Sequence, residues 1–189
     1  MIFLDWDDIF DDDRHNDGRI NEEFIARVDD IRGLSSPLAS EESTRISLQY
    51  IREQRDGLNK HRQSLLNRVP EQEQWAVFSL ESIEDKDLAY LSAATGDEFA
   101  LLRGKNQDIL YRGNSLHCHI EKDELLMSLL EEHKICLECH SHPDCGTIVP
   151  SQDDRNFIAS FGQKTSRIVS SYTGKVITFH ANKFDDLLK

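Results

Sequence analysis

Two histidines separated by one residue, His140 and His142, are the side chains of this sequence best placed to bind a metal ion. In an extended strand successive side chains alternate between faces, so both imidazoles would project to the same side and could share one ion. Ser151 is suited to cap a following helix, and Asp154 then falls in the first turn of that helix, where its carboxylate could reach the imidazoles. Catalytic zinc sites use three such ligands and hold a water molecule at the open fourth position. The sequence therefore predicts an open zinc site.

A zinc site that activates water also needs an acidic residue that accepts a proton and passes it to a leaving amine. Glu98 is the favoured candidate, because it begins a predicted strand, where a carboxylate is uncommon unless it is exposed or used. Its neighbour Asp97 is an alternative. Glu138 is a third candidate, since strict alternation along the strand would place it on the same face as the two histidines. Ser151 could in addition hydrogen-bond the oxyanion that forms when a carbonyl is attacked.

From about residue 73 to the end, the chain alternates between strand and helix patterns, which must position these side chains. The predicted strands are 75–80, 99–104, 107–111, 135–142, 167–172 and 175–180, and the predicted helices are 83–94, 121–133 and 151–161. We therefore expect an α/β domain over residues 73–189, in which a mixed β-sheet is flanked by helices. Trp75 and Phe179 are expected in its core.

Residues 1–72 are interpreted as an acidic, helical N-terminal extension that ends near Pro70. The helices predicted there are 21–31 and a segment from Ser40 or Ser43 to about Arg68. Gly57 weakens the middle of the second segment, so two shorter helices are an alternative. The extension could dock a partner or brace the following domain, and its deletion is expected to spare zinc binding.

Two other segments could bind metal ions. Residues 13–24 partly resemble a calcium-binding loop, but His15 and Phe24 stand where oxygen ligands belong, and a solvated acidic segment is the alternative. His117 and His119 alternate along a possible strand and could form a second metal site, but we interpret them as partly exposed structural residues.

The four cysteines are expected to be thiols, because no export signal is evident; they are Cys118, Cys136, Cys139 and Cys145. Cys136 and Cys139 followed by a histidine match the attachment pattern of c-type haem, but that chemistry requires export. Cys136, Cys139, Cys145 and a histidine could instead form a closed structural zinc site. The simplest interpretation is that Cys136 and Cys139 are small core residues.

The formal net charge of −13 argues against a nucleic-acid partner, because such proteins present clusters of lysine and arginine. No apolar run approaches the roughly 20 residues that span a bilayer. The acidic N-terminus does not resemble a signal peptide, so a cytoplasmic protein without a membrane segment is expected.

Together these residues resemble the JAMM (JAB1/MPN+) zinc metalloproteases. That family's pattern is a glutamate, then His-Ser/Thr-His-Pro, about seven residues, and Ser-x-x-Asp. The matching segments here are Gly96–Gly104, His140-Ser141-His142-Pro143 and Pro150-Ser151-Gln152-Asp153-Asp154. The resemblance covers roughly residues 73–184 and leaves out the first 70.

The resemblance implies an MPN/JAB-like fold with zinc bound by His140, His142 and Asp154, Glu98 as the general base, and Ser151 stabilising the tetrahedral intermediate. Members of the family hydrolyse amide bonds, typically the isopeptide bond between a ubiquitin-like protein and a lysine. Bacterial relatives process ubiquitin-like tails, small-molecule conjugates or sulfur-carrier proteins.

The sequence departs from the family spacing twice. Residues 143–150 make the loop one residue longer than usual, so that strict counting selects Asp153; Asp154 is preferred because it keeps the Pro-Ser-x-x-Asp unit intact. Glu98 lies six residues before Gly104, which ends its predicted strand, whereas the family commonly has seven. Asp97 keeps the family spacing.

The expected activity is that of a bacterial-type, deubiquitinase-like isopeptidase that uses Zn²⁺. Two alternatives stay open, a non-catalytic MPN-type scaffold and an amidase that acts on a small-molecule conjugate.

Overall fold

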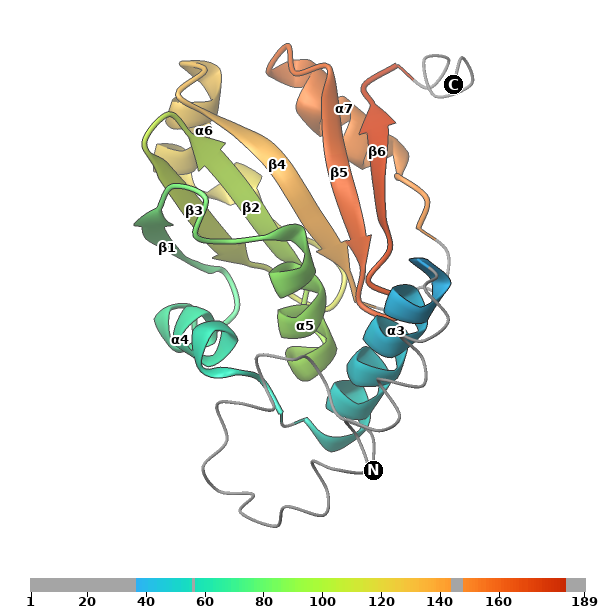
Figure 1. The fold of residues 1–189 in the computed structure, drawn as a ribbon. Coiled ribbons are helices and arrows are strands. Elements are labelled where there is room, and N and C mark those ends of the chain that lie inside the picture. Colours follow the sequence, from blue (N-terminus) through green and yellow to red (C-terminus); the bar gives the residue numbers. More distant parts are fainter. Residues whose placement is uncertain (1–36, 56, 144–147, 183–189) are drawn as a thin grey trace, which may run out of the picture.

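The computed structural model describes residues 37–55, 57–143 and 148–182. Within them the strands form one sheet in the order β1-β3-β2-β4-β5-β6 (Figure 1). The strands are β1 (Gln74–Ser79), β2 (Phe99–Gly104), β3 (Gln107–Arg112), β4 (Ile135–His142), β5 (Thr165–Ser170) and β6 (Val176–His180). Neighbouring strands pair antiparallel except β4 and β5, which are parallel. The predicted α/β class with a mixed sheet flanked by helices is therefore confirmed.

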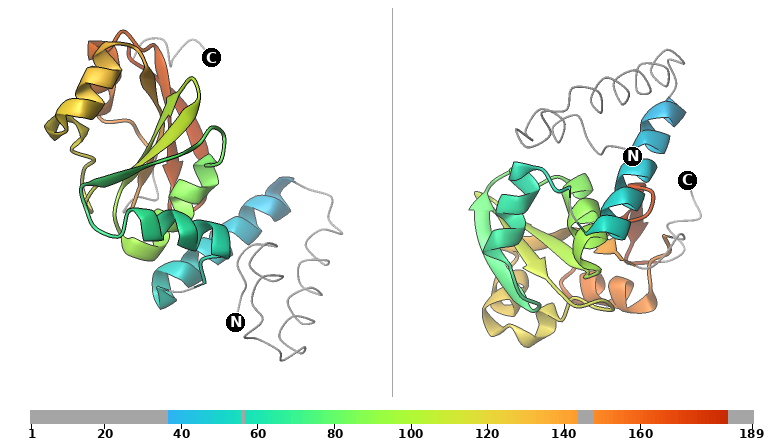
Figure 2. Two further views of the ribbon diagram at one scale, coloured as in Figure 1. Left: turned by 90° about the vertical axis from the view of Figure 1, so that its left-hand side faces the viewer. Right: turned by 90° about the horizontal axis from the view of Figure 1, so that it is seen from below.

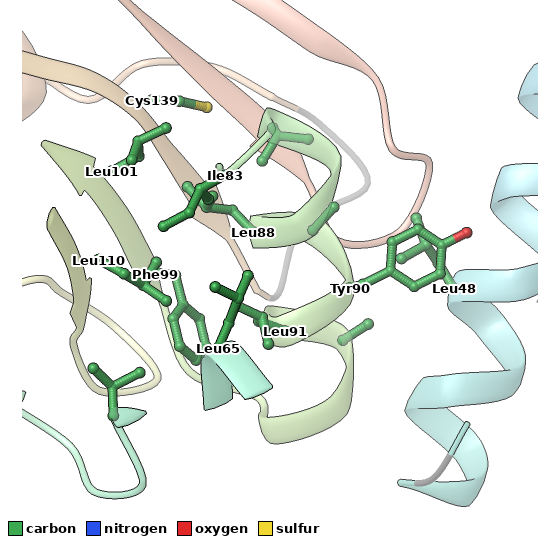
Figure 3. Close-up of a cluster of buried hydrophobic side chains, with 14 of the residues drawn as sticks. Leu48, Leu65, Ile83, Leu88, Tyr90, Leu91, Phe99, Leu101, Leu110 and Cys139 are labelled. Carbon is green, nitrogen blue, oxygen red and sulfur yellow. The ribbon is translucent and has the colours of Figure 1, made fainter. Parts of the chain in front are cut away.

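The sheet is covered by helices on both faces (Figure 2). The helices are α3 (Pro37–Gln54), α4 (Lys60–Arg68), α5 (Asp85–Thr95), α6 (Glu124–Glu131) and α7 (Gln152–Ser160), with a short 3₁₀ helix at Ile120–Lys122. The first three pack on one face, where they share the hydrophobic cluster shown in Figure 3. In β2, Phe99 and Leu101 belong to this cluster, whereas Ala100 and Leu102 pack with α6 and α7. A strand buried on both faces is therefore a continuous apolar run.

The predicted bounds of β2 and β4 agree with the structure, but the helix predicted at 121–133 is interrupted. The carboxylate of Asp123 accepts a hydrogen bond from the backbone N–H of Leu126 at 3.0 Å and thereby caps α6. Its other oxygen accepts the indole N–H of Trp75 at 2.7 Å. Trp75 is half-buried, whereas Phe179 lies in the core as expected.

The long helix predicted to end near Arg68 is two helices, as the alternative interpretation held. Gly57, between them, has a φ of +93°, which a residue without a side chain adopts readily. Asn59 then caps α4 by accepting the backbone N–H of Arg62 at 2.8 Å. The first helix begins at Pro37, ahead of the predicted Ser40, and proline is favoured in the first turn of a helix.

Helices α3 and α4 pack directly on α5. Leu48, Ile51 and Leu65 are each at most 3% exposed and belong to the same cluster as the apolar residues of α5. The domain boundary at residue 72 stays a prediction. The helix at 21–31 and the calcium-like loop lie outside the described residues.

The described cysteines, Cys118, Cys136 and Cys139, are free thiols, and Cys139 is fully buried in the core under α5. Cys145 lies outside the described residues, so the closed zinc site that would include it stays a prediction. No helix in the described part of the chain is long and apolar enough to cross a lipid bilayer.

Candidate metal centre

Three side chains from two elements converge at the C-terminal end of β4. The Nε2 atoms of His140 and His142 are 3.2 Å apart, and the Oδ1 atom of Asp154 is 3.2 Å from the Nε2 atom of His140. All three atoms lie within 4.8 Å of one another. Within the described residues this is the one group of histidine, cysteine and acidic side chains compact enough to hold a metal ion.

The spacing of these atoms fits a tetrahedral metal ion. Two ligands that each lie about 2.0–2.1 Å from zinc at a tetrahedral angle are separated by about 3.3 Å. The two observed separations of 3.2 Å are close to that value. Imidazole nitrogen and carboxylate oxygen suit zinc, although the same donor set also suits ferrous iron. The residues therefore fit a divalent ion with at least one coordination position left for water or substrate.

The aspartate is held by its own helix cap. Ser151 Oγ accepts the backbone N–H of Asp154 at 3.0 Å, and Asp154 Oδ2 accepts the backbone N–H of Ser151 at 2.6 Å. This reciprocal pair is the capping box that the sequence predicts at the start of α7. It occupies one carboxylate oxygen of Asp154 and directs the other to His140. Asp153, the residue that strict counting selects, is exposed and does not belong to the group.

His140 and Asp154 each shift the pKa of the other. Burial alone would raise the pKa of the Asp154 carboxyl, but its contacts with His140 and Ser151 hold that pKa well below the usual range. Burial alone would lower the pKa of His140, but Asp154 and the nearby Glu98 raise that pKa above its ordinary value. Because a metal ion binds the neutral imidazole, metal binding at His140 competes with a proton.

The structure separates Glu98 from its neighbour Asp97. Glu98 is 8% exposed and lines the same cavity as the three candidate ligands. Asp97 instead lies 2.8 Å from a guanidinium nitrogen of Arg112 and accepts a hydrogen bond from Gln72 at 2.7 Å. Glu98 is therefore placed to act on a group bound in the cavity, whereas Asp97 joins two segments of the scaffold.

The expectation that Glu138 shares a face with the histidines is wrong, because β4 contains a β-bulge. Leu102 pairs with Leu137 and Leu101 pairs with Cys139, so Glu138 is an extra residue in β4. The extra residue shifts the alternation of side chains. Leu137 lines the cavity together with the histidines, whereas Cys139 packs in the cluster under α5.

Glu138 is held on the α5 side of the sheet by two arginines. It forms ion pairs with Arg167 and, at 3.5 Å, with Arg103. Arg167 also contacts Asp85, the first residue of α5, at 3.1 Å. These contacts give Glu138 a structural role in fixing the bulge, and they remove it from the candidates for the base.

The candidate ligands lie in an open cavity of about 760 Å³. One wall is formed by residues 115–121, which follow β3, and this wall includes His117, Cys118 and His119. Two large apolar side chains that line the cavity, Leu116 and Val149, are 67% and 66% exposed. The two histidines of the wall have ring centroids 5.7 Å apart and belong to no compact metal-binding group among the described residues.

Local sequence patterns did not place residues 115–121 beside the site, although the pairing of β2 with β3 requires that position. Phe99 pairs with Arg112, so Glu98 must stand opposite Gly113, and the residues that follow must pass the site.

Comparisons of the chain with models of protein families, with curated proteins and with solved structures found no match. The case for a functional site therefore rests on the residues and the geometry described above.

Proposed function

We propose that this protein is a zinc-dependent hydrolase of the JAMM type, which cleaves an isopeptide or peptide bond at the C-terminus of a ubiquitin-like protein. The observation that carries the proposal is the convergence of His140, His142 and Asp154 in one open cavity that Glu98 also lines. The motif resemblance names the same four residues from their order in the chain. An MPN-like identity of the fold is part of this proposal.

His140, His142 and Asp154 would hold the zinc ion, which supplies Lewis-acid activation of water and of the substrate carbonyl. Glu98 accepts a proton from the attacking water and delivers it to the nitrogen of the leaving amine. Its small exposed fraction keeps the carboxylate away from bulk solvent, where the proton would be lost.

Ser151 would stabilise the developing oxyanion. Its Oγ accepts a hydrogen bond from the backbone N–H of Asp154, so its own hydroxyl proton is available to a group in the cavity. A single donor of this kind contributes a factor of about 10²–10³ in kcat in other hydrolases.

The shape of the cavity supports a polypeptide tail as substrate. It is open to solvent and has exposed apolar side chains, Leu116 and Val149, that an extended segment could contact. Its volume of about 760 Å³ also falls within the range of about 300–1,000 Å³ that is typical of small-molecule sites. An amidase for a small conjugate is therefore the second candidate.

The test is the cleavage of a ubiquitin fused through its C-terminal glycine to a short fluorescent peptide. The wild type is expected to cleave it, to lose activity with a chelator and to regain activity with added zinc. Glu98→Gln is expected to be inactive. Glu138→Gln, which changes another of the three candidate acids and one that lies on the opposite face of the sheet, is expected to stay active.

A wild type that holds zinc but cleaves neither this fusion nor a panel of acyl-lysine amides would contradict a hydrolytic function. Cleavage of the small amides alone would select the second candidate.

A further inference from the structure

The backbone of Glu98 is fixed by the chain that follows β3. Its N–H donates to the carbonyl oxygen of Asn114 at 2.8 Å, and its carbonyl oxygen accepts the N–H of Gly113 at 2.8 Å. These bonds extend the hairpin of β2 and β3 by one residue. They fix where the side chain of Glu98 begins, but not where its carboxylate points.

The same loop brings the thiol of Cys118 close to Glu98. Asn114 closes a tight turn, in which its Oδ1 accepts the N–H groups of Leu116 and His117 at 2.8 and 3.0 Å. The turn folds Cys118 back onto Gly113. A methyl group at Gly113 would lie 2.9 Å from the sulfur of Cys118 and 2.3 Å from the carbonyl oxygen of His117. The missing side chain of Gly113 therefore makes room for the sulfur beside the backbone partner of Glu98.

Cys118 and Glu98 both line the cavity, and the sulfur of Cys118 fills the space beside Gly113, the residue whose N–H is bonded to Glu98. Burial raises the pKa of the thiol well above its ordinary value, and the negative charge of Glu98 raises it further. The sulfur therefore keeps its proton at neutral pH. A protonated thiol next to a carboxylate is a hydrogen-bond donor, and not a nucleophile.

We propose that Cys118 is a positioning residue, which donates its S–H to one carboxylate oxygen of Glu98 and turns the other oxygen toward the candidate metal ligands. This inference rests on the proposed function, in which Glu98 is the base. A glutamate side chain has several rotatable bonds, and a base must stay within hydrogen-bonding distance of the proton it takes. The thiol supplies a contact that favours one rotamer.

The test compares three substitutions at this position in the full-length, zinc-loaded protein. Cys118→Ala and Cys118→Val both remove the donor but change the side-chain volume in opposite directions, whereas Cys118→Ser keeps a donor. We expect kcat to fall about three- to tenfold in the Ala and Val variants, as for the loss of one weak hydrogen bond to a charged group. KM and the zinc content should stay unchanged, and the serine variant should recover most of kcat.

Cys136→Ala is the matched control. Cys136 is also a partly buried thiol, and it donates to the carbonyl oxygen of Arg103 away from the cavity. Its substitution is expected to leave kcat unchanged. Thermal unfolding of each zinc-loaded variant separates a loss of folding from a loss of positioning.

The inference is overturned if kcat of the Ala and Val variants equals that of the wild type while Glu98→Gln is inactive. It is also overturned if Cys118→Ser is as impaired as Cys118→Ala, because the effect would then come from packing. Failure of the proposed function looks different, since the wild type itself would then cleave no substrate.

Discussion

The described part of the predicted N-terminal extension packs on the helix and sheet that support the candidate metal ligands, so deletion of residues 1–72 is expected to unfold the protein. Four of its side chains, Leu48, Ile51, Leu65 and Val69, are 0–3% exposed and belong to the hydrophobic cluster that α3, α4 and α5 share. This outcome is the reverse of what the acidic, helical character of the segment indicates when the sequence is considered alone.

The size of the effect follows from these buried side chains. Burying one of them contributes about 1.5–3 kcal/mol, so the four contribute about 6–12 kcal/mol. A typical domain has a total free energy of unfolding of about 5–15 kcal/mol. Deletion would therefore remove most of the stability, and it would expose the facing residues of α5 as well.

The extension also contacts the turn between β5 and β6, which is bonded to the end of the strand that carries the candidate ligands. Arg52 donates to the carbonyl oxygen of Ser171 at 2.6 Å, and its guanidinium lies 3.7 Å from the ring centroid of Tyr172. Ser171 in turn donates its N–H to the carbonyl oxygen of His142 and its hydroxyl to that of Pro143. Removing α3 would therefore loosen the end of β4 and lower the affinity for metal.

Chemical denaturation of the full chain, of residues 73–189 and of a pair of point variants measures this. Leu48→Ala is expected to lower the free energy of unfolding by about 2–5 kcal/mol. Gln49→Ala changes an exposed neighbour on the same helix and should shift it by less than about 0.5 kcal/mol. A fragment 73–189 that unfolds cooperatively and binds one zinc ion would refute the reasoning.

Three further predictions follow from single contacts. Ser151→Ala should retain zinc but lower kcat about 10²–10³-fold, with about 1 kcal/mol lost from the free energy of unfolding through the cap, as steady-state kinetics and denaturation would show. Asp123→Ala should cost about 1–2 kcal/mol and change the fluorescence of Trp75, because the cap of α6 and the partner of the indole are both lost; an unchanged spectrum would contradict the indole contact. Gly174→Ala and Gly162→Ala both place a side chain at a φ near +67°, but a methyl group at Gly174 would lie 2.5 Å from Thr44 Cγ2, whereas nothing lies within 4 Å at Gly162. The Gly174 variant should therefore have the lower melting temperature, and equal values would refute the close contact.

Much of the fold could be predicted from local patterns. The apolar run of β2 and the strand that ends in His140 and His142 have their predicted bounds, because burial on both faces of a sheet leaves a continuous apolar signal. The capping box of Ser151 and Asp154 could also be predicted, since it depends on residues three apart.

The rest depends on interactions that local patterns do not encode. The bulge at Glu138 is visible only in the register of β4 against β2, so strict alternation put this residue on the wrong face. Asp123 ends one helical segment and begins another because its carboxylate also has a tertiary partner in Trp75. The packing of α3 and α4 on α5 joins residues far apart in the sequence, and composition alone could not reveal it.

The central claim is that His140, His142 and Asp154 bind one metal ion, and elemental analysis of purified protein tests it most directly. Wild type prepared without chelator is expected to contain one zinc ion per chain. Asp153→Asn, at the exposed neighbouring position, should retain it, and Asp154→Asn should lose it. Zinc-free wild type after growth and purification with added zinc, or an Asp154→Asn variant that binds zinc as tightly as Asp153→Asn, would contradict the account.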